Sequence, residues 1–190
     1  MRTQTEEVRG RIVEAAYESF WRQGFRRSSV DSIAERAGLT KRTVYAYFRS
    51  KDDLLAAVLQ RYEELAEERL AHIGDRLPAD RIGLVDSFFG QLIGWANATP
   101  RWSGSGLTRL VVELADLPGH PARAIARRAK AKTEFWLAGR LADARVANAR
   151  DRACEIMLLT EGAMALTLIH GGRSYIDAAA VVARQLVRKR

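Results

Sequence analysis

The spacing of apolar residues is the feature that most constrains the fold of this chain. Through nearly all of its 190 residues, apolar side chains recur three or four positions apart, which places them on one face of an α-helix. Alternating apolar and polar runs bounded by turn residues, the pattern of half-buried strands, are absent from the sequence. We therefore expect an all-α protein. With 47% hydrophobic residues, the chain has enough apolar side chains to bury a core.

Capping residues and helix breakers divide this pattern into successive helices. Glycine or proline follows most of the periodic segments, and serine or threonine precedes several of them. The expected helices span residues 4–23, 30–37, 41–48, 50–74, 80–98, 107–116, 121–144, 151–170 and 175–189.

The turn between the second and third expected helices is unusually short. Only Gly38, Leu39 and Thr40 separate them, and Thr40 stands where a helix N-cap is expected. Glycine permits a left-handed backbone, and a turn of this length sets two helices at a steep angle. The spacing therefore predicts a helix-turn-helix.

The exposed side of the third helix is basic and polar. Val44 and Phe48 are expected to face the core, and the outer side carries no carboxylate; it presents Lys41, Arg42, Thr43, Tyr45 and Tyr47. Arginine and lysine donate to guanine acceptors, threonine contacts a thymine methyl group or a phosphate, and tyrosine donates to phosphates. Lys51, at the start of the next helix, is placed to hold a phosphate.

The overall charge fits the same partner. A formal net charge of +8 and a pI near 10.1 favour an anionic partner, either nucleic acid or an anionic membrane surface. Basic residues alternate with acidic ones on most helices, which disfavours the membrane surface. A basic helical hairpin also arises without this function, so double-stranded DNA is one of two open interpretations at this point.

About the first 55 residues carry a family resemblance. The pattern is Ile12-x-x-Ala15-Ala16-x-x-x-Phe20-x-x-x-Gly24-Phe25, then Ile33-Ala34-x-x-Ala37-Gly38, then Thr43-Val44-Tyr45-x-Tyr47-Phe48-x-x-Lys51-x-x-Leu54-Leu55. This pattern resembles the DNA-binding domain of the TetR family of bacterial regulators. The resemblance implies that DNA is contacted by Ser29, Thr40, Lys41, Arg42, Thr43, Tyr45, Tyr47 and Lys51. Tyr47 departs from the family, which often has histidine at that position.

Two C-terminal helices are candidates for a dimer interface. The helix over 151–170 is apolar on more than one face, and a monomer easily covers only one of them. The resemblance implies that the last two helices pair with a second copy as a four-helix bundle; the alternative is a helix fully buried in a monomer. The expected interface residues are Ile156, Leu159, Ala163, Leu166, His170, Ile176, Ala179, Ala180, Ala183 and Val187.

The C-terminal part is also rich in aromatic residues and methionine. If these side chains converge, they line an apolar pocket for a small molecule, whereas ordinary core packing is the alternative. The expected lining residues are Phe88, Phe89, Leu92, Trp95, Trp102, Trp136, Met157 and Met164. Glu113 and Glu161 are the candidate polar anchors, and each could instead pair with an arginine.

Several other classes of protein are disfavoured. Cys154 is the single cysteine, so a disulfide within the chain is excluded, and a reducing compartment fits. The N-terminal segment lacks the apolar stretch of a signal peptide, and residues 156–169 fall short of the ~20 apolar residues of a membrane span. His72, His120 and His170 lack the spacing of metal ligands. We therefore expect a cytoplasmic protein without a metal or cofactor.

Together these patterns predict a helix-turn-helix domain over residues 1–50 and a helical ligand-binding and dimerisation domain over 51–190. The expected function is a homodimeric repressor that binds a pseudo-palindromic operator and is released by a small, largely apolar effector. The alternative is a small-molecule-binding or catalytic helical protein that does not bind DNA. Residues 103–106 are glycine-rich, but no strand precedes them as an active-site elbow or phosphate loop would require.

Overall fold

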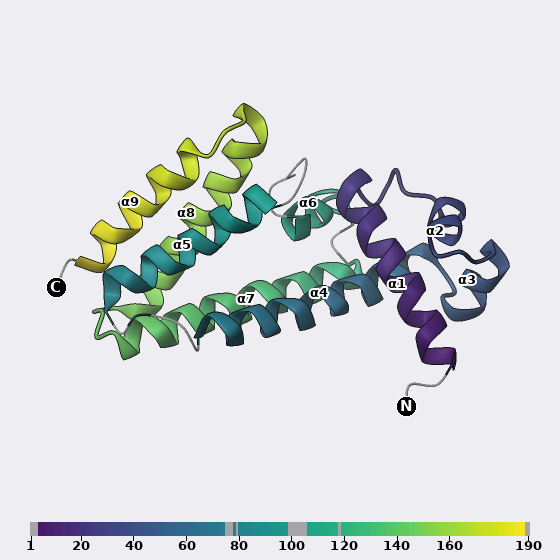
Figure 1. Cartoon of the computed structure of the whole chain (residues 1–190), viewed down its shortest axis with the longest axis horizontal. Coiled ribbons are helices and arrows are strands. Elements are labelled where there is room, and N and C mark those ends of the chain that lie inside the picture. The colour runs from purple at the N-terminus through teal and green to yellow at the C-terminus, as the bar shows by residue number, and fades with distance from the viewer. Residues whose placement is uncertain (1–3, 75–77, 79, 99–105, 118, 189–190) are drawn as a thin grey trace. The chain divides into compact units, whose positions relative to one another are not determined.

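A computed structural model describes residues 4–74, 78, 80–98, 106–117 and 119–188 of the chain. Over these residues it consists of α-helices without a strand, so the all-α prediction is confirmed (Figure 1). The helices are α1 Gln4–Gln23, α2 Val30–Arg36, α3 Lys41–Tyr47, α4 Lys51–Gly74, α5 Arg81–Ala98, α6 Gly106–Val112, α7 Pro121–Asp143, α8 Ala149–His170 and α9 Ser174–Arg188. Helix α6 ends earlier than the expected 107–116, because residues 113–116 form turns.

Local hydrogen bonds explain why these helices begin and end where they do. The hydroxyl of Ser29 accepts from the backbone N–H of Ser32 at the start of α2. Thr40 does the same for the N–H of Thr43 at the start of α3, over 3.1 Å. Each cap satisfies a donor that has no partner inside the helix. Gly38, after α2, has a φ of +64°, a left-handed conformation that favours glycine.

The contacts divide the described residues into two compact units. Unit 1 comprises residues 1–65 and 106–128, and unit 2 comprises 66–105 and 129–190. The division expected at residue 50 is therefore wrong as a packing boundary. The first part of α4 belongs with the preceding helices because Leu54, Leu55 and Val58 are completely buried there.

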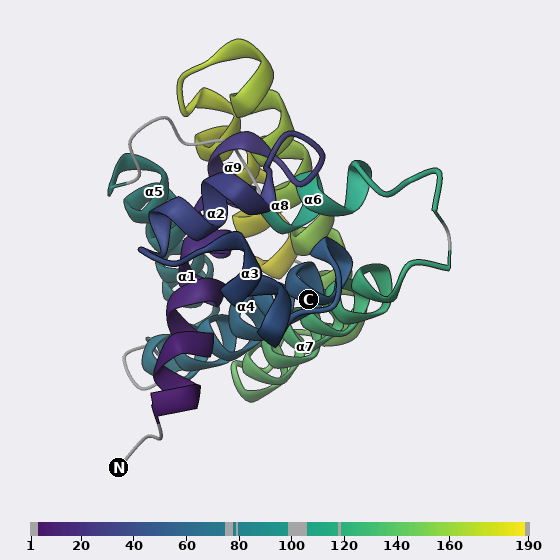
Figure 2. The ribbon, with the colours of Figure 1, turned by 90° about the vertical axis from the view of Figure 1, so that its right-hand side faces the viewer.

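Unit 1 contains the helix-turn-helix. In Figure 2, the viewer faces α1, α2 and α3. Its core combines Ile12 and Phe20 of α1, Ile33 of α2 and Val44 of α3, all at most 1% exposed. Removing these side chains from water is the main term that fixes α3 on the other helices.

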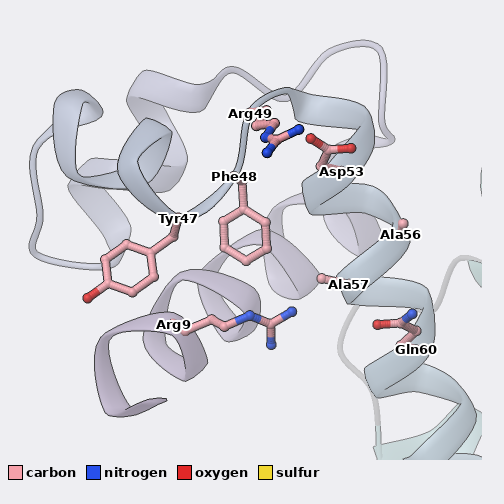
Figure 3. A pocket seen from close by; sticks show the side chains of 8 residues that line it. All are labelled: Arg9, Tyr47, Phe48, Arg49, Asp53, Ala56, Ala57 and Gln60. Carbon is pink, nitrogen blue, oxygen red and sulfur yellow. The ribbon is translucent and has the colours of Figure 1, made fainter. Parts of the chain in front are cut away.

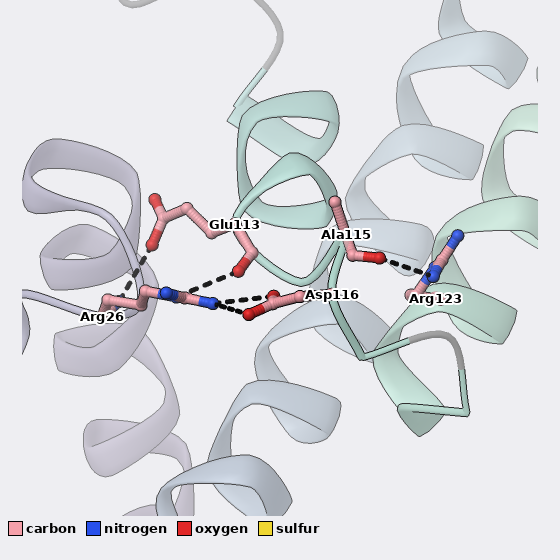
Figure 4. Close-up of polar contacts among 5 residues, drawn as sticks. All are labelled: Arg26, Glu113, Ala115, Asp116 and Arg123. Atoms are coloured by element: carbon pink, nitrogen blue, oxygen red, sulfur yellow. Dashed lines mark hydrogen bonds and ion pairs between the residues drawn. The ribbon is translucent and has the colours of Figure 1, made fainter.

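Arg26 ties the segment after α6 to the loop between α1 and α2 within unit 1 (Figure 4). Its backbone N–H donates to the Glu113 carboxylate over 2.9 Å, and its side-chain Nε donates to the Glu113 carbonyl oxygen over 3.1 Å. Its Nη2 donates to both carboxylate oxygens of Asp116, at 2.7 and 2.8 Å. The hydrogen bond from Arg26 holds the pKa of Asp116 below its ordinary value, so this carboxylate is charged at neutral pH.

Unit 2 is built from α5, α8, α9 and most of α7 around a single apolar cluster. The cluster's completely buried members include Leu137 and Leu141 of α7, Ala153 of α8, and Ile176 and Ala183 of α9. Small residues on α8 and α9 allow the two helix backbones to approach closely. The inner faces of both helices are thereby covered within the chain itself.

Candidate nucleic-acid interface

Two buried side chains determine which face of α3 is exposed. Val44 is 1% exposed and Phe48, at the C-cap, is 5% exposed, so both are anchored in unit 1. The opposite face then presents Lys41, Arg42 and Tyr45, all exposed, and half-buried Thr43 and Tyr47. The structure thus brings the predicted base-facing residues of α3 together on one outer surface, which carries no carboxylate from α3 itself.

The predicted contacts Ser29 and Thr40 both serve as helix caps. Their side chains are exposed, and each accepts a backbone N–H of the helix that it begins. The Thr40 hydroxyl also shares a hydrogen bond of 2.8 Å with the Thr43 hydroxyl. Capping does not consume a hydroxyl, which can donate and accept at once, so both residues keep a capacity to contact phosphate.

Lys51 has a role besides the one that the sequence predicts. Its ammonium group donates to the backbone carbonyls of Phe25 and Ser28, at 3.0 and 3.2 Å, and lies 4.4 Å from the centroid of the Phe25 ring. These two bonds leave one of the three ammonium donors, so the phosphate contact that the sequence predicts for Lys51 stays a prediction. The side chain is turned inward because the carbonyls at the end of the α1–α2 loop need a donor, which the start of α4 supplies.

Arg9 and Arg49 were missed by the sequence analysis. They line a groove of about 420 Å³ beside the end of α3, together with Tyr47 and Phe48 (Figure 3). The Arg9 guanidinium lies 5.3 Å from the centroid of the Phe48 ring, a cation–π contact. In the described part of the chain, neither Arg9, Arg42 nor Arg49 takes part in an ion pair. The sequence could have indicated Arg49, because it directly follows Phe48, which was expected to face the core.

The helix-turn-helix segment is similar in sequence to known bacterial regulators. The family model of bacterial regulatory proteins of the tetR family matches residues 12–58. The transcriptional activator FasR of Mycolicibacterium smegmatis is 44% identical over 57 residues, which are 30% of this chain and 26% of that protein. The transcriptional regulator UidR of Escherichia coli K12 is 30% identical over 97 residues, which are 48% of this chain and 50% of that protein. Residues 12–58, which contain the helix-turn-helix, are therefore similar to the DNA-binding segment of TetR-family regulators.

The fold of the chain is shared with solved structures over nearly its whole length. A TetR-family transcriptional regulator from Streptomyces coelicolor superposes with a TM-score of 0.84, covering 96% of this chain and 95% of the other at 21% identity. The reduced form of NemR from Escherichia coli superposes with a TM-score of 0.83 at 18% identity, covering 95% and 97% of the two chains. The matched segments span about a quarter to a half of the length of the curated relatives FasR and UidR.

The candidate ligand-binding residues are only partly brought together. Phe88, Phe89, Leu92 and Trp136 meet in or against the core of unit 2, where core packing accounts for them. Met157 and Met164 are buried on α8. Trp102 and the side chain of Trp95 lie outside the described residues.

The two proposed polar anchors have partners of their own. Glu113 belongs to unit 1, where its carboxylate accepts from the Arg26 backbone N–H, whereas the other described candidates lie in unit 2. The pairing occurs because α6 ends at Val112 and turns the carboxylate toward the α1–α2 loop. Glu161 is within unit 2 and forms an ion pair with Lys130 of α7.

The expected dimer residues divide into two groups. Seven of the ten are buried in the core of unit 2, and their contact with a partner stays a prediction: Ile156, Ala163, Ile176, Ala179, Ala180, Ala183 and Val187. Leu159 packs against the same core. Leu166 and His170 remain exposed. Small and branched residues form the inward face because α8 and α9 pack on each other, and periodicity alone does not distinguish inner from outer faces.

The outer faces of α8 and α9 carry large apolar residues that the sequence analysis did not select. Leu158 is 75% exposed and Ile169 is 70% exposed, and Leu168, Val181 and Val182 are also exposed. By length and composition, α8 could cross a membrane, with 39% of its apolar window buried, although a soluble protein's core helix passes the same test. The apolar composition of α8 has a simpler explanation than a membrane span, because one of its faces belongs to the core of unit 2.

The inward position of Lys51 generates a prediction. Lys51→Met keeps the alkyl chain and removes the ammonium, so the two carbonyls lose a charged donor. We expect the free energy of unfolding to fall by about 1–3 kcal/mol. Urea denaturation measures the free energy of unfolding. Arg27→Met is the control, because it removes an exposed cation of the same unit. We expect it to change the free energy of unfolding by no more than about 0.5 kcal/mol. Equal stability of the two variants would contradict the inward role.

Proposed function

We propose that this chain is a TetR-family transcriptional regulator that binds double-stranded DNA through α3. The observation that carries the proposal is the exposed face of α3, which presents Lys41, Arg42, Thr43 and Tyr45 without a carboxylate from the helix. Arg9 and Arg49 extend this face with two further cations. Such a surface supplies both base-edge donors and phosphate contacts. Repression, rather than activation, is part of this proposal.

Selection from a random pool of duplexes tests DNA binding. We expect one preferred sequence, and Arg42→Ala or Thr43→Ala should reduce its preference by ~1–3 kcal/mol for each lost base contact. The double substitution Arg9→Ala with Arg49→Ala should instead weaken all duplexes alike and flatten the slope of log affinity against log salt by about 1.8, because two phosphate contacts are lost. A wild-type chain that selects no sequence would contradict the proposal and favour a helical protein without DNA binding.

We further propose that the chain acts as a homodimer whose interface is the outer face of α8 and α9. Apolar patches of this kind are rare on the free surface of monomers. A second copy is the partner that fits, because a two-fold axis would place the patch around Leu158 and Ile169 against the same patch of the second copy. The dimer would present two α3 helices to a pseudo-palindromic site, with half-sites ~34–36 Å apart or a multiple of that distance.

Charge placed on the outer face of α8 tests this dimer. Leu158→Glu combined with Ile169→Glu should give monomers in sedimentation velocity at micromolar concentration, because carboxylates without partners are costly to bury. Phe135→Glu is the matched control, since Phe135 of α7 in the same unit is 76% exposed and lies off this face. Monomers should bind the selected duplex more weakly. Dimers that survive the double substitution would contradict the assigned face.

The effector is proposed to be a small, largely apolar molecule that binds unit 2 in the cytoplasm. Phe88 and Trp136 support this, because both stay half-buried although they pack against the core. A ligand releases DNA only to the extent that it prefers the conformation that does not bind DNA.

A screen of apolar aromatic compounds tests the effector. We expect a compound that quenches tryptophan fluorescence, releases the selected duplex, and at 100 times its dissociation constant stabilises the fold by about 2.7 kcal/mol. Trp136→Phe should reduce the quenching and leave DNA binding without ligand unchanged. A compound that binds but leaves DNA affinity the same would contradict an effector role.

A further inference from the structure

Lys41, the first residue of the recognition helix α3, is held by an acidic residue of another helix. Its Nζ donates to Oδ2 of Asp31, in the first turn of α2, over 2.8 Å. Both side chains are well exposed, at 52% for Lys41 and 66% for Asp31. The hydrogen bond raises the pKa of Lys41 above its ordinary value, so the ammonium is fully charged at neutral pH. Asp31 is thus a carboxylate beside a face to which α3 itself contributes none.

A carboxylate in this position has two physical effects on DNA binding. It repels phosphate, and it restricts a lysine side chain whose many rotamers would otherwise let the ammonium reach the nearest phosphate. An ammonium has three donors, and Asp31 takes one of them. The remaining donors suit the acceptors of a base edge, such as O6 and N7 of guanine.

The other cations of this face lack such a partner. In the described residues, Arg9, Arg42 and Arg49 form no ion pair, although Asp53 lines the same groove as Arg9 and Arg49. Arg36, at the opposite end of α2 from Asp31, pairs with Glu18 of α1 over 3.0 Å. The Asp31–Lys41 pair is therefore the place where a carboxylate restrains a cation that α3 presents to DNA.

We infer that Asp31 is a specificity-determining residue, which positions Lys41 for a base acceptor and keeps phosphate away from it. This inference rests on the proposed DNA-binding function. Because the exposed ion pair between Lys41 and Asp31 is weak, the Lys41 ammonium can turn toward the acceptors of a correct base without a large movement of the side chain. Asp31 therefore lowers the affinity for wrong sequences more than the affinity for the right one.

Asp31→Asn tests the inference, because asparagine keeps the shape of the side chain but loses the charge, and the N-cap Ser29 is untouched. Dissociation constants are measured over a salt series for the selected duplex and for a scrambled duplex of equal length. On the scrambled duplex we expect affinity to rise severalfold and the log–log salt slope to steepen by about 0.9, because Lys41 then reaches a phosphate. The ratio of specific to non-specific affinity should fall about tenfold.

Two comparisons separate positioning from a general charge effect. Glu18→Gln removes the same charge from the Arg36 pair, which does not involve α3, and should leave the ratio of specific to non-specific affinity unchanged. In a Lys41→Ala background, Asp31→Asn should no longer change that ratio, because it acts through Lys41.

An unchanged ratio and salt slope for Asp31→Asn would overturn the inference. So would a loss of thermal stability with the ratio unchanged, which would give Asp31 only a stabilising role in the first turn of α2. A wild-type chain without any sequence preference would overturn the proposed function itself, and the role of Asp31 with it.

Discussion

The burial of Val44 and Phe48 is the constraint on which the DNA-facing surface depends. A seven-residue helix is too short to be stable alone, so α3 exists because one of its faces is removed from water. That choice of face turns Arg42 and Tyr45 outward. It also fixes the Phe48 ring, over which Arg9 lies. The same two side chains therefore hold the helix in unit 1 and decide what it can offer to a nucleic acid.

The cations around α3 differ more in their partners than in their residue type. Lys51 is committed to carbonyl oxygens inside the unit, and Lys41 is paired with an exposed carboxylate. Arg42 and Arg49 have no ion pair in the described residues. If the Lys51 ammonium turned away, two backbone carbonyls would lose their hydrogen-bond donor, which costs free energy. The exposed pair of Lys41 and Asp31 opens at little cost. Each of these residues adds one unit to the net charge, but the structure leaves them differently free to contact an anionic partner.

Helix ends could be predicted from the sequence because they are set by neighbours in the chain. Thr40 caps α3 and Gly38 adopts the left-handed conformation, both as expected. Contacts between distant segments could not be predicted in this way. Glu113 was assigned to a pocket because nothing in its neighbourhood reveals Arg26, which lies 87 residues away along the chain. Likewise, α8 is apolar on two faces, and periodicity shows that two faces exist without showing which one the rest of unit 2 covers.

The two faces of α8 connect the fold to the proposed mode of DNA recognition. One face is used within the chain by Ile156 and Ala163, while Leu158 and Ile169 remain on the other. A single helix-turn-helix makes a small interface with DNA and gains most of its affinity from phosphates, which carry no direct sequence information. Joining two copies places a second recognition helix at high effective concentration over the adjacent half-site. In the proposed dimer, the apolar outer face of α8 is what would bring the second recognition helix into place.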